Sequence, residues 1–276
     1  MRKYPLFFFF LMAYTFSWIL LIPSVLSSWG LLQGDFGITF VLHTFGPALA
    51  AVVLVKAIEG RAGLRRLRGR IQQWRAGWHW YLFILAGIPA LLVLGIIIQP
   101  GMLASFQGLK LLLLVSYPLT FFAVWFGGGP LGEEVGWRGF ALPRMQSRYG
   151  PLWGTLLLGV LWCFWHLPEY LTPNMGGGPG TGLVTFLTNF PLFLLFVLAL
   201  SIIFTWVFNH TRESVFISIT AHASVDTPQV VLVPLFLAVN VTSLFLASLI
   251  AFGIPALLIV IVTRGRLGYQ ASQEQR

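Results

Sequence analysis

Two adjacent acidic residues interrupt an otherwise apolar region in the stretch Gly132-Glu133-Glu134-Val135-Gly136-Trp137-Arg138-Gly139. The chain of 276 residues has only eight acidic side chains, and two of them stand here, with an arginine four residues after the second. Ionised carboxylates near hydrocarbon are costly and usually mark function. We therefore expect the rest of the chain to form a membrane scaffold that holds this stretch at depth.

The composition predicts an integral membrane protein. Hydrophobic residues make up 57% of the chain and charged residues 9%, whereas about a quarter of the residues in a soluble domain are charged. The length leaves room for about eight spans of ~20 residues and no sizeable soluble domain. We predict an all-α, polytopic membrane protein of about eight transmembrane helices, a single integral membrane domain over residues 1–276. Its parts are N-terminal spans (1–128), a motif-bearing core (129–228) and a last span with its tail (229–276).

The apolar runs place the expected spans. They cover about residues 6–26, 37–57, 80–98, 109–126, 152–167, 183–208, 214–228 and 241–262. The first run exceeds the roughly 7–15 apolar residues of a signal peptide, so we interpret it as a span. The segment Gly127-Gly128-Gly129-Pro130 is a strong helix breaker, after which a new helix is expected to carry the acidic pair.

The positive charges predict how the chain lies in the membrane. The net charge is +9, but the arginines fall in loops beside apolar spans, which suits orientation and anionic lipid better than nucleic acid. We expect the basic loop Arg61–Arg75 to be an interfacial amphipathic segment. We predict a multi-pass protein of the cell membrane, its partners a substrate and the lipid bilayer. Both termini and the acidic stretch should lie toward the cytoplasm. The basic residues assigned to that side also include Arg2, Lys3, Arg144, Arg148, Arg212, Arg264, Arg266 and Arg276.

The acidic pair has two different helical phases. Glu134 and Arg138 are four residues apart and share one helix face, so they can form an ion pair. Glu133 is rotated by about 100° and is left without this partner. The spacing therefore predicts one structural glutamate and one glutamate that is free for chemistry.

Two further polar clusters stand in apolar spans. His166 ends an aromatic-rich span, with Trp162 one turn earlier on the same face. His222 and Asp226 are also one turn apart, so the carboxylate can accept a proton from the imidazole. His43, His79 and His210 lie near span edges and are weaker candidates. The single Cys163 rules out an intrachain disulfide and a cysteine-rich metal site.

Intramembrane polar side chains must meet in the protein interior, because none of them can face lipid. A glutamate and a histidine around one water form a general-base pair, and a second imidazole can stabilise an oxyanion. These groups together are sufficient for hydrolysing an amide.

The order and composition of these clusters resemble the CPBP family of CAAX prenyl proteases and bacteriocin-processing enzymes, also called Abi proteins. The family motifs are two glutamates, three residues and an arginine; an aromatic residue, three residues and a histidine; and a histidine, three residues and usually an asparagine. The matching residues here are, in order, Glu133, Glu134 and Arg138; Trp162 and His166; His222 and Asp226. The resemblance runs from about residue 129 to residue 226.

The resemblance implies an eight-helix intramembrane glutamic endopeptidase with its active site in the helix bundle and no cofactor. It implies that Glu133 and His166 activate the attacking water, that His222 and the residue at 226 stabilise the oxyanion, and that Glu134, Arg138 and Trp162 support the site. The departure is Asp226, because an ionised aspartate cannot donate a hydrogen bond as asparagine does. Asp226 would donate if it is neutral, or orient His222 if it is ionised. We expect the first role, since the family usually carries asparagine there.

Other functions stay open on the sequence. Glu133, His166 and His222 could supply three zinc ligands, although the paired-histidine helix motif of zinc proteases is absent. A non-catalytic immunity or scaffold protein, or a proton-coupled transporter, would also carry intramembrane polar groups. The sequence does not name the peptide or protein substrate, nor whether that substrate carries a lipid.

Overall fold

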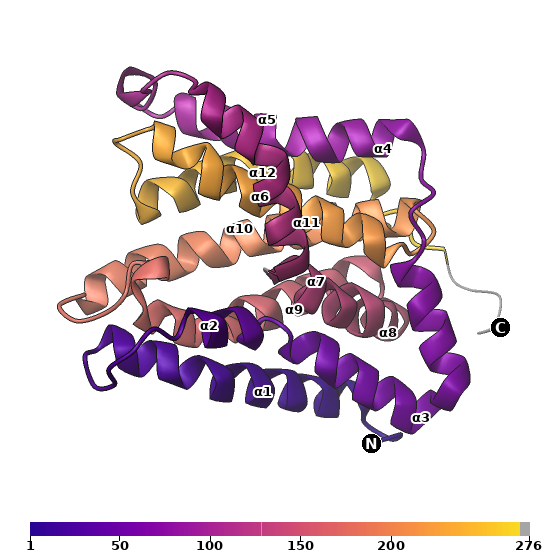
Figure 1. Cartoon of the computed structure of the whole chain (residues 1–276). Helices are drawn as coiled ribbons and strands as arrows, with labels where there is room; N and C mark the ends of the chain where they lie inside the picture. Colours follow the sequence, from indigo (N-terminus) through magenta and orange to yellow (C-terminus); the bar gives the residue numbers. More distant parts are fainter. Residues whose placement is uncertain (128, 271–276) are drawn as a thin grey trace.

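The apolar runs of the sequence fold into helices that pack side by side (Figure 1). The computed structural model describes residues 1–127 and 129–270, and over these ranges it contains no β-strand, only one isolated bridge between Phe106 and Phe236. The α-helices are α1 (Pro5–Ser28), α2 (Gly37–His43), α3 (Gly46–Ile71), α4 (Trp78–Leu82), α5 (Ile88–Ile97), α6 (Leu111–Gly127), α7 (Gly129–Gly136), α8 (Leu142–Tyr149), α9 (Pro151–Trp165), α10 (Leu183–His210), α11 (Val215–Val231) and α12 (Val241–Thr263).

Short helical turns connect several of these helices. Two π-helical turns, η1 (Phe83–Gly87) and η3 (Trp137–Ala141), continue α4 into α5 and α7 into α8. The 3₁₀ turns are η2 (Leu103–Ser105), η4 (Leu167–Leu171), η5 (Pro173–Met175) and η6 (Val233–Leu235).

The all-α polytopic membrane fold expected from the sequence is confirmed, with fewer candidate spans than the eight expected. Within residues 1–127 and 129–270, five continuous segments are long and apolar enough to cross a membrane: residues 5–28, 78–97, 151–171, 183–210 and 241–263. α2 with α3, and α6 with residues 129–149, form two bent pairs at 41° and 42°, which raises the number to seven. α11 has 17 residues and is shorter than these spans.

Two expectations about helix ends are corrected. The basic segment after Arg61 is not a loop, because α3 continues through it to Ile71 beyond a kink at Gly60, whose φ of +64° suits glycine. α11 does not end at Pro228 but continues to Val231. The sequence predicts a helix break before the acidic pair, and the axes of α6 and of residues 129–149 differ in direction by 42° there. Gly128 and Arg276, which also entered those expectations, lie outside the described residues.

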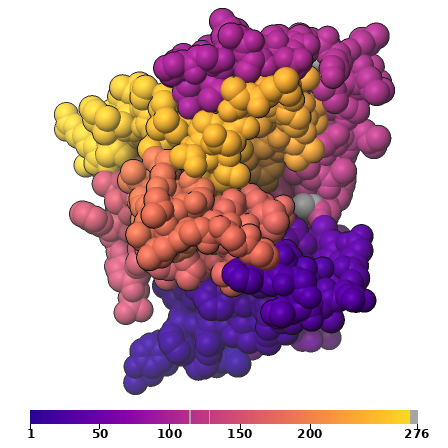
Figure 2. All heavy atoms as spheres, turned by 90° about the vertical axis from the view of Figure 1, so that its left-hand side faces the viewer, coloured from indigo at the N-terminus to yellow at the C-terminus, as the bar shows by residue number. Residues whose placement is uncertain are grey.

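α10 lies at the centre of the bundle and is the most buried of the five long spans. It packs against α9 on one side and α12 on the other, while α1 packs on α3 and α11 packs on α6 and α7. α6 crosses the other helices steeply in Figure 1. Figure 2 shows the indigo N-terminal helices below α10, and both the orange-yellow C-terminal segment and the purple segment of α4 and α5 above it. The short helix α7 therefore lies inside the bundle, where its side chains meet α9 and α11.

Ion pairs join distant segments at one end of the bundle. Arg144 of α8 binds Glu59 of α3, and Arg70 binds Glu213 in the loop between α10 and α11. The N-terminus and the end of α12 lie at this same end, on the right in Figure 1. The arginines that the sequence assigns to one side of the membrane are thus gathered together.

Candidate active site

Two glycines set α7 against the start of α3. A Cβ atom at Gly132 would lie 2.5 Å from the carbonyl oxygen of Thr44, and one at Gly136 would lie 2.4 Å from Cβ of Pro47. Both distances are far too short for real atoms, so only glycine permits this approach. Because the two glycines are four residues apart, they share the face of α7 toward α3. The intervening glutamates therefore point to other sides of the helix.

Glu134 and Arg138 form the ion pair that the sequence predicts. Arg138 Nη1 donates to Glu134 Oε1 at 2.8 Å, and both side chains are fully buried. The guanidinium carbon of Arg138 also lies 4.6 Å from the ring centre of Trp162 and 4.9 Å from that of Phe204. Cation–π contacts of this kind stabilise a desolvated arginine. The pair thus connects α7 and η3 to α9 and α10.

Glu133 is held by two indoles. Trp162 Nε1 donates to Glu133 Oε2 at 2.6 Å, and Trp137 Nε1 donates to the same oxygen at 3.2 Å. A Cβ atom at Gly129 would lie 2.3 Å from Glu133 Oε1, so this glycine keeps that side of the carboxylate clear. Glu133 is therefore fixed in place by neutral donors, whereas Glu134 is bound by an arginine.

His222 lies between two carboxylates. Its Nδ1 is 2.9 Å from Glu134 Oε1, and its Nε2 is 3.5 Å from Asp226 Oδ2. The spacing of the sequence predicts the contact with Asp226 but not the closer one with Glu134. An imidazole that donates from Nδ1 to Glu134 has a fixed ring orientation with Nε2 toward Asp226. The buried ion pair of α7 thus also orients a histidine of α11.

Trp162 connects the remaining candidate residues. His166 Nδ1 lies 2.9 Å from the carbonyl oxygen of Trp162 and can donate to it, while the indole of Trp162 binds Glu133. The indole ring also meets His222 edge to face at 5.4 Å. One residue of α9 therefore contacts Glu133, Arg138, His166 and His222. No direct hydrogen bond between Glu133 and His166 is present among the described residues.

The sequence reasoning missed three contributors near His166. Trp137 donates to Glu133, and His43 pairs with Glu169, which follows His166 by three residues. The sequence analysis ranked His43 low because it lies near the edge of an expected span, yet only 2% of it is exposed. Glu169 is one of only eight acidic residues in a chain of apolar spans, and this rarity could have identified it as a candidate site residue.

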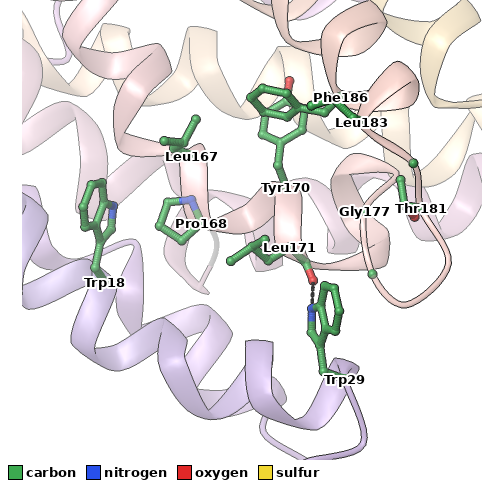
Figure 3. Close-up of a pocket in the computed structure, with 12 residues that line it drawn as sticks. Trp18, Trp29, Leu167, Pro168, Tyr170, Leu171, Gly177, Thr181, Leu183 and Phe186 are labelled. Carbon is green, nitrogen blue, oxygen red and sulfur yellow. Dashed lines mark hydrogen bonds between the residues drawn. The ribbon is translucent and has the colours of Figure 1, made fainter.

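The candidate site opens on the side of Asp226. The side chain of Asp226 is 34% exposed, whereas that of His222 is 8% exposed. Two apolar cavities of about 420 and 430 Å³ are both lined by Pro168, and the first is also lined by Leu167, which directly follows His166. Trp18 and Leu171 line both, and Figure 3 shows the first cavity, with the indole of Trp29 hydrogen-bonded to the carbonyl oxygen of Leu171. These cavities adjoin the polar cluster and do not contain it.

The polar cluster contains side chains of the types that bind metal ions. A carboxylate and two imidazoles are donors that zinc accepts. Within the parts of the chain that the structure describes, no three His, Cys, Asp or Glu side chains are placed to hold one metal ion. Glu133, His166 and His222 therefore do not form a preassembled three-ligand site in this geometry.

Comparison with known proteins finds similarity over part of the chain. Residues 114–228 match the Rce1-like family model, which is described as type II CAAX prenyl endopeptidase Rce1-like. A curated relative, CAAX prenyl protease 2 of Methanococcus maripaludis, is 31% identical over 103 residues. That alignment covers 35% of this chain and 35% of the relative, so the match spans about a third of the relative's length. Residues 114–228, matched by the family model, contain all three polar clusters of the candidate site.

The two glutamates should differ sharply in their effect on stability. Glu134→Gln leaves the Arg138 charge buried without a carboxylate, and breaking such a pair costs about 3–5 kcal/mol. Glu133→Gln keeps an oxygen that accepts from both indoles, so we expect a melting temperature close to that of the wild type. Thermal unfolding of the purified variants in detergent measures both. Equal melting temperatures for the two variants would contradict this assignment.

Proposed function

We propose that this chain, whose residues 114–228 match the Rce1-like family model, is an intramembrane endopeptidase that hydrolyses a peptide bond in a CAAX-type protein substrate. The observation that carries the proposal is the position of Trp162, which binds Glu133 through its indole and His166 through its carbonyl oxygen. A general base and its partner must be held in a fixed mutual geometry to activate one water. Trp162 supplies that constraint from a single rigid helix.

In the proposed reaction, a water between Glu133 and His166 loses a proton to Glu133 as its oxygen attacks the scissile carbonyl carbon. The tetrahedral intermediate carries a negative oxygen, which is stabilised by donors from His222 and Asp226. Collapse of the intermediate breaks the C–N bond, and the proton held by Glu133 passes to the leaving amine. Glu134 and Arg138 take no part in proton transfer and orient His222.

The surroundings of the site suit a substrate that carries a lipid. The two cavities beside His166 are lined almost entirely by apolar side chains, including Trp18 and Leu171. An apolar chain bound there gains about 0.8 kcal/mol per buried CH₂ group relative to water. We therefore propose a prenylated peptide as the first substrate to test.

A prenylated reporter peptide with a fluorophore and quencher on either side of the scissile bond tests the function. We expect cleavage by the purified wild type and a loss of at least about 100-fold for Glu133→Gln, the usual range for a lost general base. Glu213→Gln is the matched control, because Glu213 pairs with Arg70 at the end of the bundle. Normal turnover by Glu133→Gln in a cleaving preparation would refute the role of Glu133.

Metal removal separates this mechanism from the zinc alternative. If Glu133 and His166 activate water directly, turnover should survive treatment with a strong chelator followed by gel filtration. Activity that disappears on chelation and returns with stoichiometric zinc would establish a metalloprotease instead. A protein that cleaves no CAAX reporter under any of these conditions would favour the scaffold or immunity function.

Asp226 is proposed to donate to the oxyanion as asparagine does in the family. Glu134 already orients His222 through Nδ1, so His222 does not depend on Asp226 for its position. Asp226→Asn should then retain nearly normal kcat, whereas Asp226→Ala should lose about 10–1,000-fold. A folded but inactive Asp226→Asn variant would instead assign Asp226 to holding a charged His222. Unchanged activity in Asp226→Ala would exclude both roles.

We propose that the arginine-rich end of the bundle, with both termini, faces the cytoplasm. Cysteines placed at Gln72 and Asn174, both exposed, report on the two ends in a Cys163→Ala background. In intact cells, an impermeant thiol reagent should label the cysteine at position 174 and spare the one at position 72. Both should react after permeabilisation. Strong labelling at position 72 in intact cells would reverse the orientation.

A further inference from the structure

A second buried ion pair lies beside His166. His43 Nε2 is 3.4 Å from Glu169 Oε1, and the two residues are only 2% and 8% exposed. They are 126 positions apart: His43 ends α2, and Glu169 lies in η4, the turn that directly follows His166. The pair therefore connects the N-terminal helices to the segment that carries a candidate catalytic histidine.

The imidazole of His43 reaches His166 through one intervening ring. It stacks on Trp165 with centroids 5.3 Å apart and planes at 17°. Trp165 in turn meets His166 edge to face at 4.7 Å, and it meets Trp137 at 5.9 Å. Since Trp137 donates to Glu133, the stack supports both proposed water-activating residues.

Glu169 holds the backbone on the other side of His166. Its amide nitrogen donates to the carbonyl oxygen of His166 at 2.9 Å. Thr172 donates from both its amide and its hydroxyl to the carbonyl oxygen of Glu169, at 2.8 and 2.7 Å. At the other member of the pair, Ser17 of α1 donates to the backbone carbonyl oxygen of His43 at 2.7 Å. Each member of the pair is therefore fixed to its own backbone segment.

Stability alone is a weak reason for such a pair. Two charges buried in the bundle lose hydration that their attraction barely offsets, and well-packed apolar residues usually replace them without loss. A buried pair does specify position, because each group must meet its partner at one distance. The ring stack and the backbone hydrogen bonds connect this pair to His166, so the pair can fix the position of His166.

We propose that His43 and Glu169 are positioning residues that fix the His166 imidazole, through Trp165 and η4, for its work with Glu133. This inference rests on the proposed function of His166. It also assigns a role to α2, because His43 lies outside the matched region of residues 114–228. The N-terminal helices would then form part of the catalytic geometry and not only of the membrane anchor.

The double variant His43→Phe/Glu169→Met separates positioning from stability. Phenylalanine keeps a ring against Trp165, and methionine keeps the length of Glu169 without its charge, so the fold should melt like the wild type. We expect kcat to fall on the order of 10- to 100-fold, as for a small misplacement of a reacting group, with KM nearly unchanged. His79→Phe is the matched control, since His79 is exposed. Wild-type kcat in the folded double variant would overturn the proposal.

A second readout does not require turnover. The rate at which diethyl pyrocarbonate modifies His166, read by peptide mass spectrometry relative to His79, should change in the double variant and in Glu169→Gln. Glu169→Gln keeps the size of the side chain and serves if the double variant does not accumulate. Unchanged modification of His166 together with unchanged kcat in Glu169→Gln would equally overturn the proposal. If the wild type cleaves no reporter, the proposed function fails, while a changed modification rate still supports positioning of His166.

Discussion

A fully buried arginine charge is the constraint on which the polar interior depends. Arg138 has no exposed surface, and a charge taken out of water costs several kcal/mol unless a partner compensates for it. Glu134 supplies the opposite charge, and the faces of Trp162 and Phe204 supply cation–π contacts. These partners come from three helices, so compensation of the Arg138 charge requires α7, α9 and α10 to pack together. His222 then shares the same oxygen of Glu134, which places α11 as well.

The two glutamates are neighbours in sequence but differ in how they are bound. Glu134 accepts from an arginine and belongs to the packing. Glu133 accepts from the indoles of Trp162 and Trp137, which carry no charge. Hydrogen bonds to an ionised carboxylate contribute about 1.5–3 kcal/mol each, enough to fix its position. Neutral donors orient Glu133 without tying its charge to a counter-ion, which suits the proposed role of Glu133 as a proton acceptor.

Contacts between residues one helical turn apart can be predicted from the sequence. Contacts between different helices cannot, because they depend on how the helices pack. The pairs Glu134–Arg138 and His222–Asp226 are four residues apart, so one helical turn brings each pair together. His222 reaches Glu134 across 88 positions and His43 reaches Glu169 across 126. No periodicity encodes those distances, because they follow from how the helices pack. The kink at Gly60 and the continuation of α11 past Pro228 were also missed, because glycine and proline can bend a helix without ending it.

Gly132 and Gly136 allow the short helix α7 to approach α3 closely enough to place Glu133 and Glu134. Side chains at either position would enter the space of Thr44 or Pro47, and α7 would have to move away from α3. A shift of even 1 Å would stretch the 2.9 Å contact between Glu134 and His222 beyond hydrogen-bonding distance. The same shift would move Glu133 relative to the indole of Trp162. The glycines that flank the acidic pair are therefore as necessary to the site as the carboxylates, although they contribute no polar atom of their own to it.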